Sequence, residues 1–505
     1  MAAKHASTPP ERMGCVVQLL AHRGEYGVVS AAGRDLGVSR QTLSTWRAAG
    51  QRALEAAFAP VAPPPAGAPP ELAPELARAI LTALIDGQAS ERGVRAELAR
   101  WGRRVSVRTI VGVVGEAGRR AQALLEQPVA VGPRVVALDE IYGKDRHGAY
   151  LSLVDAQAGA VWATAGPVAV DGDSWTLLAW QAQARGLDLA GTVSDGGQAI
   201  RHGAAAIGAP EQLDVWHTLH RCGQARARLE GWERALQARA AAATRAAARV
   251  AARAPLRGRP PAAPLAARLA AVERAHYVTT ALHYLTGELH RLLDVVVVMA
   301  GRLLAPAERQ AEAAALLALL ADLAADAPTD AQPELQRLHR HLVTALPRLL
   351  AFTQPLGAAQ AQVAPLLAPD AIALIAWAWQ RRAILGPTTE DLLAGLPPAW
   401  RPAARLLLAA WDRAVRASSL VESWHSFLRP HLAVHRVLRP GLLALLAVAY
   451  NHHASQRGVH RGTTPLQRAG LADAPTDWLT ALGYPPASGA PAVASAGRQS
   501  LPQAA

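Results

Sequence analysis

The sequence predicts a mixed α/β core that is interrupted by a large all-helical insertion and preceded by all-helical units. Short apolar runs typical of strands are confined to residues 134–214, where helical segments separate the later ones. Leu- and Ala-rich helical patterns fill residues 218–415 almost entirely. Helical patterns also fill residues 13–58 and 75–130, on either side of a Pro-rich stretch.

Composition limits the class of protein. The 505 residues suggest about three domains. Hydrophobic residues make up 51% of the chain, which allows a sizeable core and excludes wholesale disorder. Lys and Arg number 52 against 39 Asp and Glu, a net charge of +13, and nearly every cation is Arg. This excess of positive charge indicates a polyanionic partner, most often nucleic acid.

Cysteine usage and hydropathy predict where the protein works. Cys15 and Cys222 are the two cysteines, so a disulfide framework and a four-cysteine zinc site are excluded, and a reducing intracellular compartment is favoured. Residues 1–13 carry no apolar signal core, and the apolar run at 295–300 is far shorter than the roughly 20 residues of a membrane span. We therefore expect a cytoplasmic protein that does not contact membranes.

Five short apolar runs are the expected strands, and two helical segments separate the later ones. The first three runs follow one another at hairpin spacing, which gives the order β-β-β-α-β-α-β. The expected strands are 134–139, 150–154, 160–164, 189–194 and 212–214.

The whole chain divides into seven segments by these patterns. They are a helical domain at 1–58, a Pro-rich linker at 59–74, a second helical domain at 75–130, the strand-bearing part of the core at 131–217, an all-helical insertion at 218–415, the C-terminal helices of the core at 416–470, and a largely disordered tail at 471–505.

Residues 31–46 have the pattern of a helix-turn-helix. Gly37 supplies the tight turn, and Ser39 can cap the second helix. The apolar side chains expected in the core are Val38, Leu43 and Trp46. The outward side chains expected to read DNA are Arg40, Gln41, Ser44, Thr45 and Arg47, because Arg and Gln suit guanine and adenine edges in the major groove. The alternative is a helical hairpin that binds a protein.

A looser second copy of this pattern lies at residues 96–114. Gly102 precedes Ser106, a second candidate cap, and the nearby arginines include Arg108, which we expect to contact DNA. The alternative is a plain helical spacer. Two DNA-reading units on a Pro-rich tether would grip an extended site.

Two aspartates are predicted to meet at one edge of the sheet. Asp139 ends the first expected strand, and Asp195 follows the fourth. If these strands are neighbours, both carboxylates emerge together and repel unless a cation lies between them. Two divalent ions roughly 4 Å apart can activate a hydroxyl and stabilise the leaving oxygen of a phosphodiester. The alternative is that each aspartate merely ends a strand at a turn.

Glu422 is the best candidate for a third acidic ligand. It lies on an expected helix whose apolar stripe is Leu420, Trp424, Phe427 and Leu428. Arg429, two turns further on, lies near the same face and can bind the scissile phosphate. The alternative is a capping box formed by Ser419 and Glu422. Glu140 is a competitor, but strand alternation sends it to the face opposite Asp139.

In this strand order, Asp139, Asp195 and Glu422 resemble the catalytic residues of the DDE transposases of the RNase H-like superfamily. The resemblance implies an RNase H-like core that holds two Mg²⁺ ions on these three residues, with Mn²⁺ as a substitute. Residues 218–415 fit the helical insertion that several branches carry before the Glu. Those branches also show a Cys-or-Asp, two residues, His motif, which Asp214 and His217 match.

The C-terminal stretch 418–471 resembles the carboxy end of bacterial insertion-sequence transposases. It has a Ser-Ser-x-Val-Glu helix start, Tyr450-Asn451, and the run Thr-Thr-Pro-Leu-Gln-Arg at 463–468. The Tyr-x-x-Arg-x-x-x-Glu signature of one cut-and-paste branch is absent, because Val415 stands at the position of its Tyr and Ser418 at the position of its Arg. That absence argues against hairpin chemistry by that route.

The resemblance implies a transposase that binds terminal inverted repeats and catalyses Mg²⁺-dependent DNA cleavage and strand transfer. Its expected partners are double-stranded DNA of the repeats and of the target, and further copies of itself in a homodimer or higher synaptic complex. The basic stretches 221–259, with ten Arg against two Glu, and 413–468, with eight Arg against one Glu, are expected to track phosphates. We expect the protein at the nucleoid.

Several side chains keep two interpretations. Asp214 and His217 either orient the active site or a DNA strand, or form a helix start and a packed histidine. Zinc at His217, His220 and Cys222 is disfavoured because a fourth ligand is missing. Two insertion tryptophans, Trp377 and Trp379, are expected in the core rather than stacked on a base.

Two other functions compete with transposition. One is a domesticated, catalytically silent DNA-binding regulator derived from a transposase, which the presence of all three acids disfavours. The other is a transcriptional regulator whose helical domain senses a ligand, which leaves the acidic set unexplained. Inverted repeats flanking the gene favour transposition over the ligand sensor.

Overall fold

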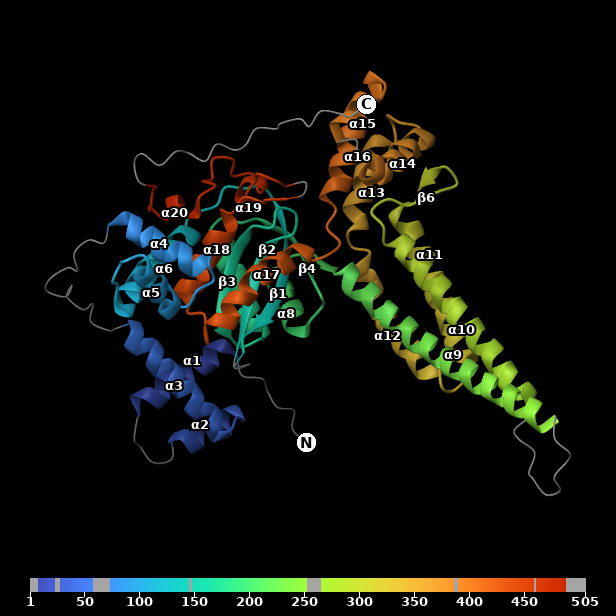
Figure 1. The fold of residues 1–505 in the computed structure, drawn as a ribbon, viewed down its shortest axis with the longest axis horizontal. Helices are drawn as coiled ribbons and strands as arrows, with labels where there is room; N and C mark the ends of the chain where they lie inside the picture. Colours follow the sequence, from blue (N-terminus) through green and yellow to red (C-terminus); the bar gives the residue numbers. More distant parts are fainter. Residues whose placement is uncertain are drawn as a thin grey trace. The chain divides into compact units, whose positions relative to one another are not determined.

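The structure, a computed structural model, describes residues 8–22, 28–57, 73–144, 148–251, 265–385, 389–457 and 460–486. The chain forms two compact units, Met1–Leu72 and Ala73–Ala505. Most of the predicted linker 59–74 and the end of the predicted tail lie outside the described residues (Figure 1). In the part of the chain that is described, no helix has the length and apolar character to span a membrane.

The first unit contains a helix-turn-helix of the predicted form. Its helices are α1 (Pro9–Ala21), α2 (Val28–Leu36) and α3 (Arg40–Ala57). Gly37 has a φ of +64°, which a turn between α2 and α3 requires of glycine. The Ser39 hydroxyl accepts a hydrogen bond from the Thr42 backbone N–H at 3.1 Å and caps α3. Leu43 is fully buried with Val38 and Trp46 packed around it, which confirms the predicted core.

The second helical segment repeats this local geometry. It contains α4 (Pro74–Ile85), α5 (Glu91–Arg100) and α6 (Val107–Leu125). Gly102 has a φ of +75°, and the Ser106 hydroxyl accepts from the Thr109 backbone N–H at 3.0 Å. One side of α6 is buried, and there Gly118 lets its backbone approach Gly441 closely: a Cβ on Gly118 would lie 2.9 Å from that backbone.

The core is a mixed five-stranded sheet with the order β3-β2-β1-β4-β5. The first three strands are antiparallel neighbours, whereas β4 is parallel to β1 and β5 is parallel to β4. The predicted element order and the α/β class with much helix are confirmed. The elements are β1 (Arg134–Tyr142), β2 (Ala149–Asp155), β3 (Val161–Val168), α7 (Gly172–Ala184), β4 (Leu189–Ser194), α8 (Gln198–Ala206) and β5 (Glu211–Leu213).

Helices cover both faces of the sheet. Val136 and Leu138 of β1 pack with Trp175 and Leu178 of α7 on one face. Alternation sends Asp139 and its cross-strand partner Ser152 to the other face. There α17 (Ser419–Val434) lies across the strands, and Trp424 donates its indole N–H to the Ser152 hydroxyl at 2.8 Å. The helix α18 (Pro440–Asn451) packs beside it.

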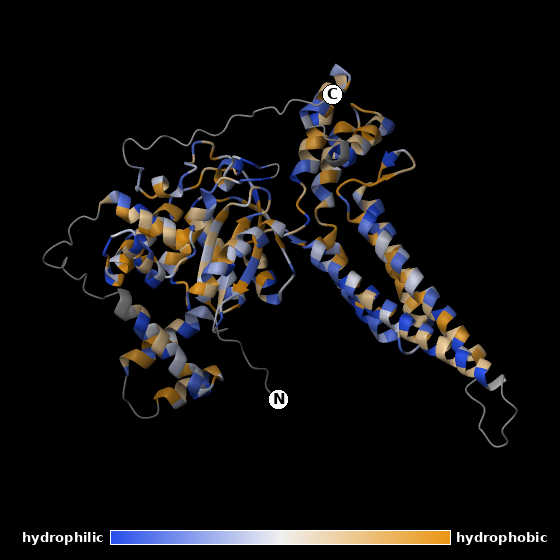
Figure 2. Ribbon diagram, viewed as in Figure 1, coloured by the Kyte–Doolittle hydropathy of each residue, from blue (hydrophilic) through white to orange (hydrophobic). Residues whose placement is uncertain are grey.

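The insertion between β5 and α17 is helical, as predicted, but it contains two cores and one short β-hairpin. The first core is shared by α9 (Val215–Ala251), α10 (Leu265–Leu292), α11 (Pro306–Asp326) and α12 (Gln332–Leu349). The second core is shared by β6 (Val298–Met299), β7 (Arg302–Leu303), α13 (Thr353–Val363), α14 (Pro369–Leu385), α15 (Thr389–Ala394), η1 (Pro398–Trp400) and α16 (Arg401–Arg413). Polar and apolar residues mix along α9–α12, as amphipathic helices require (Figure 2).

Two predictions about the rest of the chain are corrected. Residues 471–486 of the predicted disordered tail are ordered, because α20 (Trp478–Ala481) buries two apolar side chains and Asp477 forms a 3.1 Å ion pair with Arg78. Among the insertion tryptophans, Trp379 packs against the second core as expected, whereas Trp377 is exposed beneath the Arg381 guanidinium.

Candidate metal centre

Strand register brings Asp139 and Asp195 to the same edge of the sheet. The last paired residues of the parallel strands β1 and β4 are Ala137 and Val193, and each aspartate lies two residues further along its chain. Asp139 does not end its strand, as the sequence suggested, because β1 continues to Tyr142 against β2. It lies two residues beyond the point where β1 loses β4 as a neighbour.

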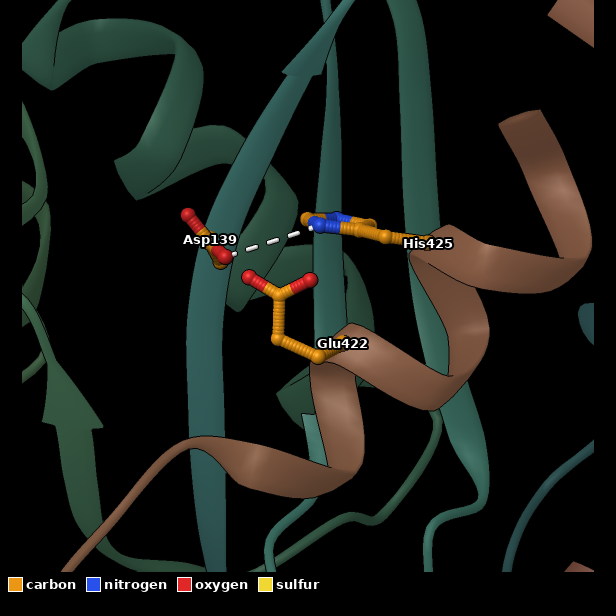
Figure 3. A group of neighbouring side chains, drawn as sticks. All are labelled: Asp139, Glu422 and His425. Atoms are coloured by element: carbon orange, nitrogen blue, oxygen red, sulfur yellow. Dashed lines mark ion pairs between the residues drawn. The ribbon is translucent and has the colours of Figure 1, made fainter. Parts of the chain in front are cut away.

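The helix α17 brings Glu422 to Asp139, together with a histidine. Atoms of Asp139, Glu422 and His425 that can bind a metal all lie within 4.8 Å of one another. Figure 3 shows the three side chains facing one another, with the imidazole and the Glu422 carboxylate both directed at Asp139. The carboxylate of Asp195 is exposed, outside this group, and accepts the Gly197 backbone N–H at 2.9 Å.

The electrostatics of the site favour a bound cation. Burial raises the pKa of Asp139 to about 7, and the negative charges of Glu140, Asp195 and Glu422 add to this effect. The backbone N–H of Glu140 donates to Asp139 at 2.9 Å and opposes it. Three further carboxylates therefore act on one half-buried carboxylate, and a cation bound there would relieve the repulsion.

His425 is the functional candidate that the sequence reasoning missed. It is 2% exposed, its Nδ1 lies 3.5 Å from Asp139 Oδ2, and its buried Nε2 has no hydrogen-bond partner. Burial lowers its pKa to about 4, so the imidazole is neutral near pH 7. The Glu-x-x-His spacing places both side chains on one helix face, as some metal sites do, but that spacing alone does not separate a ligand from a histidine packed in a core.

The capping-box interpretation of Glu422 is wrong. The N-cap of α17 is Ser418 rather than Ser419, and the Ser418 hydroxyl bonds to Asp214. Glu422 instead pairs with Arg429, whose guanidinium lies 3.0 Å from Oε2, so the prediction that these two share a face is confirmed. Both side chains are about half exposed and can meet a ligand from solvent.

Asp214 connects the end of β5 to the start of α17. It is 2% exposed and accepts hydrogen bonds from the Ser418 backbone N–H at 2.8 Å and from the Ser418 hydroxyl. It also accepts the backbone N–H groups of Trp216 and His217 at the start of α9. Asp214 thus starts α9, as the helix-start interpretation predicted, and it also holds the start of α17 four residues before Glu422. Its role in orienting the active site or a DNA strand stays a prediction.

His217 lies at the border of the acidic site. Its Nδ1 is 3.3 Å from Asp214 Oδ2, and this contact raises its pKa, with smaller contributions from Asp195 and Asp139. The neighbouring Trp216 is 59% exposed and stacks on His220 with ring centroids 5.1 Å apart. Cys222 is buried in the insertion core, and among the described residues no zinc group forms around it.

The predicted DNA-reading side chains are accessible. Five of them are exposed and Arg47 is half-buried; the exposed ones are Arg40, Gln41, Ser44, Thr45 and Arg108. Along α9, the exposed arginines are Arg221, Arg228, Arg234, Arg239, Arg245 and Arg249. Some are neutralised within the insertion, as where Arg228 pairs with Glu334 at 2.8 Å.

The C-terminal motif residues stabilise the fold rather than enter the site. Asn451 of α18 exchanges two hydrogen bonds with the backbone of Val161 in β3. Thr464 caps α19 (Pro465–Arg468), and the Arg468 guanidinium donates to the Ala158 carbonyl at 2.9 Å. These contacts hold the C-terminal helices against the β2–β3 turn.

No protein-family model matches the chain, and no curated protein matches it.

Proposed function

We propose that the protein is a DNA transposase with an RNase H-like core and a metal-dependent active site at Asp139, Asp195 and Glu422. One observation carries the proposal. Two aspartates extend in the same register from neighbouring parallel strands, and a helix more than 200 residues later presents a glutamate to the first of them. The sheet order β3-β2-β1-β4-β5, with the first three strands antiparallel, supports the RNase H-like assignment.

The residues present fit a divalent metal ion. Carboxylate oxygens are the ligands that Mg²⁺ and Mn²⁺ take, and Asp139 and Glu422 place such oxygens within 4.8 Å of each other and of a His425 ring nitrogen. A metal bound there would activate a hydroxyl and stabilise the leaving oxygen of a phosphodiester. Arg429 would hold the scissile phosphate beside Glu422, and His217 would bind a neighbouring phosphate or hydroxyl.

The proposed reaction has two phosphoryl-transfer steps. Water attacks a phosphodiester at the end of the element, and the 3′-oxygen leaves as a hydroxyl. That 3′-hydroxyl then attacks a phosphodiester of the target DNA, whose own 3′-oxygen leaves. Neither step needs a covalent bond to the protein, so no Ser or Tyr nucleophile is required.

Two helix-turn-helix segments support a DNA substrate. In each segment, a glycine with positive φ precedes the second helix, and a serine caps that helix. The capping residues are Ser39 and Ser106, whose hydroxyls accept the backbone N–H of the threonine three residues later. Exposed Arg and Gln side chains at the start of α3 suit base edges in the major groove. The exposed face of Trp216, beside the acidic site, offers a stacking surface for a nucleobase.

The test uses a plasmid that carries the gene's own flanking DNA. Purified protein is added with Mg²⁺ or Mn²⁺, and strand breaks are mapped at nucleotide resolution for the wild type, Asp195→Asn and Asp188→Asn. Asp188 is an exposed aspartate that directly precedes the first residue of β4, whereas Asp195 directly follows the last one. Asp188→Asn therefore removes one negative charge, as Asp195→Asn does, but at the other end of the strand. Breaks at the repeat ends that persist in Asp188→Asn and vanish in Asp195→Asn and with chelator support the proposal.

Two other outcomes redirect it. Specific binding of the flanking DNA without cleavage in either metal supports the catalytically silent DNA-binding protein. Absence of specific binding contradicts the DNA-reading role of both helix-turn-helix segments, and therefore the transposase proposal.

A further inference from the structure

The most distinctive feature of the site is a buried nitrogen among carboxylates. The imidazole of His425 projects from α17 toward Asp139, one helical turn after Glu422 (Figure 3). Its Nδ1 lies 3.5 Å from Asp139 Oδ2, too far for a short charge-assisted hydrogen bond. Its Nε2 has no partner although the side chain is buried. The imidazole is thus held by no short hydrogen bond, and an ion shared by Nδ1 and Asp139 would account for its orientation toward the carboxylate.

The spacing of the three side chains fits a shared ion. Ligand atoms that each lie about 2.1 Å from one ion are separated by roughly 3.0 Å at right angles and about 4.2 Å when opposite. The 3.5 Å between His425 Nδ1 and Asp139 Oδ2 falls within this range. The ligand atoms of the three residues all lie within 4.8 Å of one another, so small side-chain movements would bring all three to bonding distance from one ion.

We propose that His425 is a direct metal ligand, so that Asp139, Glu422 and His425 form a mixed nitrogen–oxygen site that prefers Mn²⁺ or a later first-row ion to Mg²⁺. Imidazole suits the transition metals, whereas Mg²⁺ takes oxygen ligands and keeps its waters. The proposal rests on the proposed function only for the use of the metal, because the binding site itself is defined by these three side chains.

The backbone explains how His425 reaches this position. Trp424, its neighbour, is fully buried and anchored to Ser152, the cross-strand partner of Asp139. That anchor fixes the distance of α17 from β2, the neighbour of β1, one residue before His425. Asp214 fixes the start of the same helix through Ser418. The ligand therefore sits on a helix held at two points, as a preorganised metal site requires.

The alternative is a positioning role, in which His425 orients the Asp139 carboxylate without touching the ion. Pulsed electron paramagnetic resonance of the Mn²⁺-loaded full-length protein separates the two, because a bound imidazole couples its ¹⁴N nucleus to the Mn²⁺ electrons. We expect this coupling in the wild type and in His217→Gln, and its loss in His425→Gln. His217 is the matched control, a histidine at the border of the same site.

A second readout does not depend on how a variant folds. Protein grown with ¹⁵N-histidine should show the ¹⁵N coupling in place of the ¹⁴N coupling, with no substitution made. Calorimetric titration with Mn²⁺ and Mg²⁺ adds the selectivity: we expect His425→Gln to lose at least tenfold in Mn²⁺ affinity, and clearly less in Mg²⁺ affinity.

The outcomes are decisive for each claim separately. Mn²⁺ binding without histidine coupling, or an equal loss of affinity for both ions, overturns the ligand role of His425, whether or not DNA is cleaved. Absence of Mn²⁺ binding overturns it as well. Histidine coupling in a protein that never cleaves its flanking DNA supports the metal site and contradicts the transposase proposal instead.

Discussion

Replacing Asp139 with Asn is expected to stabilise the metal-free protein, and more at pH 8 than at pH 5. Burial and three nearby carboxylates raise the pKa of Asp139 from 3.8 to about 7. Between these values the folded state holds a proton that the unfolded state has lost. The stability that this proton contributes is full below about pH 4 and declines as pH rises toward 7, opposite to the usual behaviour of a paired aspartate.

The size of the effect follows from the shift. One pKa unit corresponds to about 1.4 kcal/mol, so the wild type loses about 2 kcal/mol of unfolding free energy by pH 5 and about 4 kcal/mol by pH 8. The Asp139 side chain is only 24% exposed, so solvent screens little of this. Asn is neutral at both pH values and removes the loss. With an unfolding entropy of about 2 cal/mol/K per residue, the melting temperature of the unit Ala73–Ala505 should rise by roughly 5 °C at pH 8 and roughly 2 °C at pH 5.

Thermal unfolding in chelator, followed by tryptophan fluorescence at both pH values, measures this difference. Asp188→Asn is the control, since it removes an exposed carboxylate just before the other end of β4, and we expect no comparable dependence on pH. Adding Mn²⁺ should raise the melting temperature of the wild type and leave Asp139→Asn almost unchanged. A gain that is equal at pH 5 and pH 8, or a loss at both, refutes the reasoning that the Asp139 carboxylate is ionised at a cost.

Three further predictions test the surroundings of the site. Ser418→Ala removes the hydrogen bond from the Ser418 hydroxyl to the buried carboxylate of Asp214, so it should cost about 1.5–3 kcal/mol of unfolding free energy and weaken Mn²⁺ binding. Ser419→Ala, at an exposed position, should change neither quantity; calorimetry measures both. Trp216→Ala should weaken the binding of single-stranded DNA about 10- to 100-fold, as measured by fluorescence anisotropy. Trp180→Ala, at a similarly exposed tryptophan of α7, should not weaken it. Equal effects of the two variants would exclude a stacking surface at Trp216. Ser39→Ala should destabilise the first unit by about 1 kcal/mol through loss of the α3 cap, and an unchanged melting temperature would contradict that cap.

Much of the core was predictable because its signals are local. Apolar runs with turn residues between them predicted the order of the strands along the chain, and the position of Asp139 and Asp195 near strand ends predicted that both lie at the same edge of the sheet. Glu422 and Arg429 could be paired because helical periodicity places residues seven apart near one face. Each of these inferences needed only the period of an element and the rule that neighbouring parallel strands end at the same edge.

His425 could not be recognised in the same way. A histidine between Trp424 and Phe427 on an apolar helix is indistinguishable, in sequence, from one that packs in a core. What separates the two is the seating of α17 on the sheet, which depends on the indole of Trp424 bonding to Ser152, 272 residues earlier. The bond from Ser418 to Asp214, across 204 residues, is equally invisible to any local pattern.

Those long-range bonds also explain how the core tolerates an insertion of this size. The backbone N–H of Val215, where the insertion begins, donates to the carbonyl of Arg416, where it ends, at 2.9 Å. Asp214 and Ser418 bond immediately beyond that pair. The two ends of the insertion are therefore closed on each other at the core surface, and the entropy of closing a loop grows only slowly with its length. Helices added between these residues change neither the position of β5 nor the start of α17, so Glu422 and His425 keep their place over Asp139.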